Sequence, residues 1–170
     1  MKTVIVALLA GVLLAPLGLA APAAAQTTAA PALRIDIPVK LAEAKVVMNI
    51  SHRDFEGDEP TGLSFLRAMT EQFRAAGTKA EIVAVFHGDA GYMLLGDATY
   101  DRVRKWHGGN PYKEQIAALQ RDGVAMEECG KTMAANGWVN GDMLPGVKIN
   151  SGANFRIVQL VQQGFVQIQP

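Results

Sequence analysis

Short apolar runs alternate with segments of helical spacing, and this alternation restricts the fold more than any other feature of the chain. The runs are typical of buried strands and cover residues 45–50, 80–86, 124–128, 147–149 and 165–168. Strands that alternate regularly with helices favour a parallel sheet. The pattern therefore predicts a three-layer α/β/α fold with a mainly parallel five-stranded sheet and helices on both faces.

The segments between these runs carry helix start and stop signals. Asn110 and Pro111 open the clearest helix, because asparagine favours the N-cap and proline suits the first turn. Ser151 is expected to cap a later helix, and residues 51–60 are expected to form a polar loop. The predicted helical segments cover residues 63–73, 92–95, 100–106, 110–123, 131–136 and 153–163.

The first 25 residues have the layout of a secretory signal peptide. Lys2 supplies a positive start, residues 4–21 are apolar, and residues 23–25 form a small-residue cleavage site. We therefore expect cleavage after Ala25 and a periplasmic location. The alternative is an uncleaved membrane anchor, since the apolar run is just long enough to span a bilayer.

Removal of the signal leaves 145 residues (170 − 25), which suits one domain with a full core. Residues 26–44 are rich in Ala, Thr and Pro and are expected to form a flexible leader before a domain at 45–170. Because Lys2 leaves with the signal, 15 basic and 16 acidic residues remain. This balance argues against nucleic-acid binding. No second run of membrane length follows, so no stable membrane insertion is expected after cleavage.

Cys129 is the only cysteine in the chain, which excludes a disulfide scaffold and a thiolate zinc site. In an exported protein, an unpaired cysteine indicates an intermolecular bond or a reactive thiol. A strand is predicted to end at Cys129 and a helix to follow it. The first backbone N–H groups of that helix would stabilise a thiolate and lower its pKa. The alternative is a small buried core residue.

Two further candidates lie at the ends of predicted strands. Asn49 ends the first strand, and His87 with Gly88 follows the second. Carboxyl ends of parallel strands share one edge of a sheet, where ligands bind. His87 is therefore a candidate acid–base or ligand-contacting residue, with a structural hydrogen bond as the alternative. The candidate ligand-binding residues are Asn49, Gly88, Gly130, Lys131 and Thr132.

Several chemistries lack their motifs. The three histidines have no metal-binding spacing, and neither a dinucleotide nor a phosphate-binding glycine motif is present. We therefore expect neither a metal nor a cofactor. An enzyme in which Cys129 works with His87 stays open, because the two side chains could meet in space.

Several segments, taken in their order, resemble the DsrE/DsrF-like (DsrEFH-like) family over residues 45–170, and in particular its exported single-domain branch. The resemblance implies a DsrEFH-like, flavodoxin-like fold and a homo-oligomer, either a trimer or a hexamer. The segments that carry it are Val83-Ala84-Val85-Phe86-His87-Gly88, Asn110-Pro111-Tyr112, the helix end at 116–123, Cys129-Gly130-Lys131-Thr132-Met133, Leu144-Pro145-Gly146-Val147 and residues 163–170.

The resemblance also implies a role for Cys129. In the sulfur-relay members, a cysteine at a strand end carries sulfur as a persulfide. The leading prediction is thus a periplasmic sulfur carrier without turnover of its own, whose partners are a donor or acceptor protein or a small sulfur compound. Relay subunits carry a basic pair after the cysteine, where this chain has Ala135-Asn136. The alternatives are a non-catalytic ligand-binding or assembly module and a thiol-dependent enzyme.

Overall fold

The computed structural model describes residues 33–170 of the chain. The predicted signal peptide at 1–25 lies outside the described residues. The chain divides into two units at Ile37, and within the first unit Arg34 forms an ion pair with Asp36. All the helices and strands of the described residues belong to the second unit, Pro38–Pro170.

A five-stranded sheet forms the centre of the second unit, with the strand order β6-β5-β4-β1-β7 and all neighbours parallel. The predicted fold class is confirmed. The register pairs Ile50 with Phe86, Phe86 with Glu128, and Cys129 with Asn150, so the strand ends lie along one edge. The strands are β1 Glu43–Ile50, β4 Lys79–Phe86, β5 Ala125–Cys129, β6 Lys148–Asn150 and β7 Val166–Ile168.

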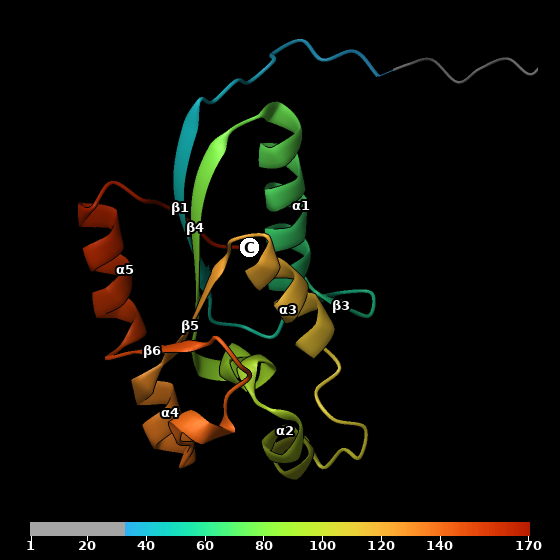
Figure 1. Cartoon of the computed structure of the whole chain (residues 1–170), viewed down its shortest axis with the longest axis vertical. Helices are drawn as coiled ribbons and strands as arrows, with labels where there is room; N and C mark the ends of the chain where they lie inside the picture. The colour runs from blue at the N-terminus through green and yellow to red at the C-terminus, as the bar shows by residue number, and fades with distance from the viewer. Residues whose placement is uncertain (1–32) are drawn as a thin grey trace, which may run out of the picture. The chain divides into compact units, whose positions relative to one another are not determined.

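Helices cover both faces of this sheet. α1 (Thr61–Ala76) and α3 (Lys113–Arg121) lie on one side of β1 and β4, and α5 (Ala153–Gln162) lies on the other (Figure 1). Side chains alternate between the faces along each strand. Met48 and Phe86 therefore pack in the cluster with α1 and α3, whereas Val47 and Val85 pack with α5.

Short helices gather beyond the carboxyl ends of the strands. η1 (Gly88–Leu94) and α2 (Asp97–Arg104) follow β4, and α4 (Gly130–Asn136) follows β5 directly. Met133 of α4 packs into the cluster on the α1 side, whereas the connection after β6 runs through α5 on the other face. Connections that leave neighbouring strands toward opposite faces open a crevice between them, which is where open α/β sheets bind ligands.

One predicted helix cap is wrong, and the other is only part of what its residue does. α3 begins at Lys113, and Asn110 Oδ1 accepts from the Tyr112 backbone N–H at 2.9 Å in the turn that leads into it. The Asn110 Nδ2 group also donates to the carbonyl oxygens of Met93 and Leu95 at 2.8 and 2.6 Å, because a buried amide needs partners and the end of η1 supplies them. Ser151 does not cap α5, whose N-cap position is Gly152.

The boundaries of two other segments also differ from expectation. β1 begins at Glu43, inside the expected leader. The expected polar loop at 51–60 contains a two-stranded antiparallel hairpin of β2 (Phe55–Glu56) and β3 (Glu59–Pro60). Within residues 33–170, no helix combines the length and the apolar character needed to cross a bilayer.

Candidate functional site

Five of the predicted site residues line one pocket of about 350 Å³, hereafter the cysteine pocket. It lies between the ends of β4 and β5 and the start of α5. Phe155 on α5 forms part of its wall and is 85% exposed. The predicted residues in the wall are His87, Gly88, Cys129, Lys131 and Thr132.

Cys129 ends β5 and is the N-cap residue of α4, as the sequence predicted. Its side chain is only 5% exposed, and its Sγ accepts a hydrogen bond from the Ala153 backbone N–H at 3.3 Å. Burial raises the pKa of the thiol, but the backbone amides of Thr132, Ala153 and Lys131 and the Thr132 hydroxyl together lower it below its usual value. The site is therefore built to hold a thiolate although little of the sulfur is exposed.

Gly130 does not line the cysteine pocket but allows it to form. A Cβ atom at this position would lie 2.8 Å from the backbone oxygen of Asn150. Glycine therefore lets α4 begin directly against the end of β6. The Gly88 N–H donates to Thr132 Oγ1 at 2.9 Å and joins the start of η1 to α4.

His87 is held by Asn49, a predicted site residue that does not line the cysteine pocket. His87 Nε2 is 2.7 Å from Asn49 Oδ1, while Asn49 Nδ2 donates to Gln169 Oε1. An amide oxygen only accepts, so His87 carries its proton on Nε2 and keeps Nδ1 as a base. Burial, reinforced by His52, lowers the pKa of His87. The ring is thus neutral at pH 7.

Lys131 brings positive charge to the cysteine pocket. Its side chain is exposed, and among the described residues its ammonium group forms no ion pair. Lys131 can therefore attract an anionic sulfur compound to this pocket.

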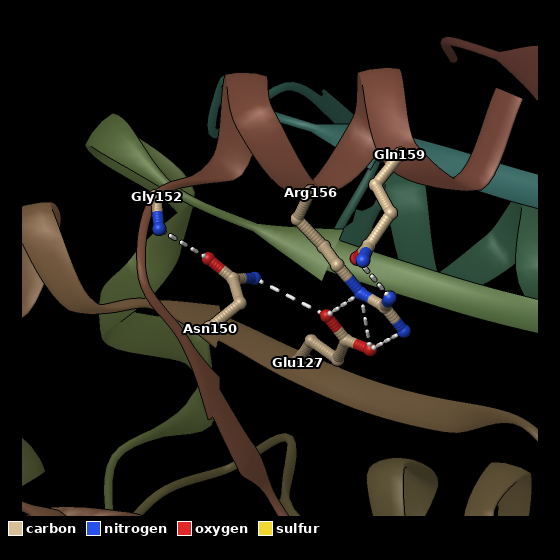
Figure 2. A network of polar contacts seen from close by, with 5 residues as sticks. All are labelled: Glu127, Asn150, Gly152, Arg156 and Gln159. Carbon is tan, nitrogen blue, oxygen red and sulfur yellow. Dashed lines mark hydrogen bonds and ion pairs between the residues drawn. The ribbon is translucent and has the colours of Figure 1, made fainter. Parts of the chain in front are cut away.

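Glu127 forms a buried ion pair that the sequence did not reveal. The Arg156 guanidinium on α5 donates to both carboxylate oxygens at 2.8 to 3.1 Å, and Asn150 Nδ2 donates at 3.3 Å (Figure 2). The partners are separated by 29 positions, so no local pattern could have found the pair. The ion pair balances the Glu127 charge and fastens α5 to β5 beside the cysteine pocket.

The Glu128 side chain points to the face of the sheet opposite to that of Glu127 and is fully buried. Neither carboxyl oxygen has a hydrogen-bond partner of good geometry. The carboxyl lies against Gly91, where a Cβ atom would come within 2.6 Å of Oε1. Burial raises the pKa of Glu128 to about 9, the Cys129 charge adds to the rise, and the Cys129 backbone amide opposes it. Glu128 is therefore protonated at neutral pH and adds no negative charge beside the thiol.

Two solved structures share this fold. A protein of unknown function, MTH1491 from Methanobacterium thermoautotrophicum, is 23% identical with a TM-score of 0.59, covering 75% of this chain and 99% of its own. The YchN protein from E. coli is 15% identical with a TM-score of 0.54 and has the same two coverages. No curated protein sequence matches this chain significantly.

A family assignment follows from a second comparison. The model of the DsrE/DsrF-like family matches residues 45–170, which include every strand end and every pocket residue described above. Within residues 33–170, no group of three or more His, Cys, Asp or Glu side chains gathers as a metal site would require. The family match and the shared fold agree, and the chain belongs to the DsrE/DsrF-like family.

Proposed function

We propose that the protein is a periplasmic sulfur carrier that holds sulfane sulfur on Cys129 as a persulfide. The observation that carries this proposal is the set of donors around Sγ. Three backbone amides and one hydroxyl lower the pKa of a thiol that lines a pocket. The thiolate is the nucleophile in sulfur exchange, so a thiol with a lowered pKa is ready to accept sulfur.

The chemistry balances without an added oxidant. The Cys129 thiol, whose pKa is lowered, releases its proton to water, and the thiolate attacks the outer sulfur of a donor persulfide, R–S–SH. The donor S–S bond breaks, Cys129 becomes Cys–S–SH, and the donor leaves as a thiolate that takes a proton. An acceptor thiolate then attacks the outer sulfur in the same way and restores Cys129.

Export and self-assembly belong to the same proposal. The layout of residues 1–25 supports export. The exposed apolar side chains of Phe155, Val158 and Val161 on α5 support contact with a second copy of the chain. Sedimentation should show an oligomer for the mature protein and a smaller species for Phe155→Ser. A mature protein that is monomeric at all concentrations would contradict self-assembly.

The experiment that tests sulfur transfer is intact-mass measurement after incubation with inorganic polysulfide. The native mature protein should gain one sulfur, roughly 32 Da, and lose it to a reducing thiol. Cys129→Ser should gain nothing.

A native protein that gains no sulfur, although the same chain gains it once unfolded, would show that Cys129 is a structural core residue. That outcome would favour non-covalent ligand binding, which the 5% exposure of the cysteine also supports.

A further inference from the structure

A second pocket, of about 380 Å³, borders the cysteine pocket. Gly88 and Thr132 line both pockets. The hydrogen bond between these two residues forms a ridge that separates the two pockets. We call this second space the arginine pocket; its other lining residues are Arg53, Asp89, Tyr92, Val103, Arg104, Ala135, Asn136 and Trp138.

The arginine pocket carries more positive than negative charge. Arg53 and Arg104 line it, and within residues 33–170 neither forms an ion pair. The Arg104 guanidinium lies 4.3 Å from the centre of the Tyr92 ring, and cation–π attraction holds it there. Asp89 is the one carboxylate in the wall. A guanidinium suits carboxylates because its planar fork can donate two parallel hydrogen bonds.

We propose that the arginine pocket binds the carboxylate end of a low-molecular-weight persulfide or disulfide whose sulfur reacts with Cys129 on the other side of the ridge. This inference rests on the proposed function, since it needs a reactive thiol. Lys131 in the cysteine pocket and the two arginines would then contact different parts of one anionic ligand. With a disulfide as the probe, the Cys129 thiolate attacks one sulfur, a mixed disulfide forms, and the released thiolate takes a proton from water.

Two disulfides of different charge test the inference. Glutathione disulfide carries carboxylates, whereas 2-hydroxyethyl disulfide is neutral. The rate of mixed-disulfide formation is followed by intact mass for the native protein, Arg53→Ala and Arg104→Ala. Each substitution should slow the reaction with glutathione disulfide roughly two- to fivefold, as expected for an exposed ion pair, and leave the reaction with the neutral disulfide unchanged.

Arg121→Ala is the matched control. Arg121 is an exposed arginine at the end of α3, before β5 begins, so it lies toward the opposite edge of the sheet. Its substitution should change neither rate. Equal slowing of both disulfides by Arg53→Ala and Arg104→Ala, or no slowing of either, would overturn the inference.

A failure of the proposed function gives a different result. If the native protein reacts with neither disulfide, the reactive thiol is disproved. Calorimetric binding of glutathione disulfide to Cys129→Ser then tests the arginine pocket by itself. Binding that weakens in the Arg104→Ala background supports the pocket, whereas no binding, or binding that Arg104→Ala leaves unchanged, rules it out.

Discussion

Glu127 and Glu128 are consecutive residues of β5, and the fold buries them in opposite ways. Glu127 faces α5, where Arg156 and Asn150 donate hydrogen bonds to its carboxylate. Glu128 faces η1, where neither oxygen has a partner. One carboxyl is therefore paired with a cation, and burial keeps the other protonated. A strand's alternation decides which face each side chain meets, and the groups on that face decide its charge.

The largest expected effect comes from removing the partner of Glu127. Arg156→Ala leaves a carboxylate buried without its cation, which should lower the free energy of unfolding by about 3 kcal/mol. Urea unfolding at neutral pH measures the change.

Arg121→Ala is the control for loss of an arginine as such and should change stability little. The double variant Glu127→Gln with Arg156→Met should recover much of the loss, because it buries no unpaired charge. A loss that persists in the double variant would show that Arg156 acts through packing alone.

The second effect concerns Glu128, the buried glutamate without a hydrogen-bond partner. The pKa of Glu128 is raised from 4.5 to about 9 in the folded protein, so folding binds a proton that the unfolded chain releases. Keeping Glu128 protonated therefore lowers the free energy of unfolding. This loss of stability is absent below the pKa of Glu128 in the unfolded chain, grows as the pH rises and levels off above about pH 9. Glu128→Gln removes the ionisable group. Its stability relative to the native protein should therefore rise by about 3 kcal/mol between about pH 5 and about pH 7.

Thermal or urea unfolding at several pH values measures this difference. Glu127→Gln is the matched control at the neighbouring position, because it removes a carboxyl that has a cation beside it and so relieves no unpaired buried group. A Glu128→Gln curve that runs parallel to the native curve would show that Glu128 is ionised in the folded protein.

The smallest effect concerns Cys129, whose sulfur accepts hydrogen bonds as the Glu127 carboxylate does. Thr132→Val removes the hydroxyl that helps lower the pKa of Cys129. The alkylation profile of the native thiol should therefore move to higher pH, by up to about one unit. Iodoacetamide labelling across pH measures it.

Thr132→Ser keeps the hydroxyl and should keep the native profile. If valine leaves the profile unchanged as well, the backbone amides alone stabilise the thiolate.

Local patterns were sufficient to predict the five strands of the main sheet and the edge where their ends meet, although they missed the hairpin of β2 and β3. The same reasoning predicted Cys129 at a junction between a strand and a helix, which is where β5 ends and α4 begins. Such predictions succeed because apolar periodicity and strand direction are properties of short segments. They missed the second role of Asn110, whose Oδ1 accepts from the Tyr112 backbone N–H while its Nδ2 donates to two buried carbonyl groups at η1, 15 and 17 positions away.

By itself, the sequence determined that the chain forms an α/β domain with one thiol at a strand end. Only the tertiary structure decided the partners around that thiol. The hydrogen bond between His87 and Asn49 and the ion pair between Glu127 and Arg156 join residues 38 and 29 positions apart. Charge and protonation depend on which groups meet in space, and no pattern of neighbouring residues specifies those meetings.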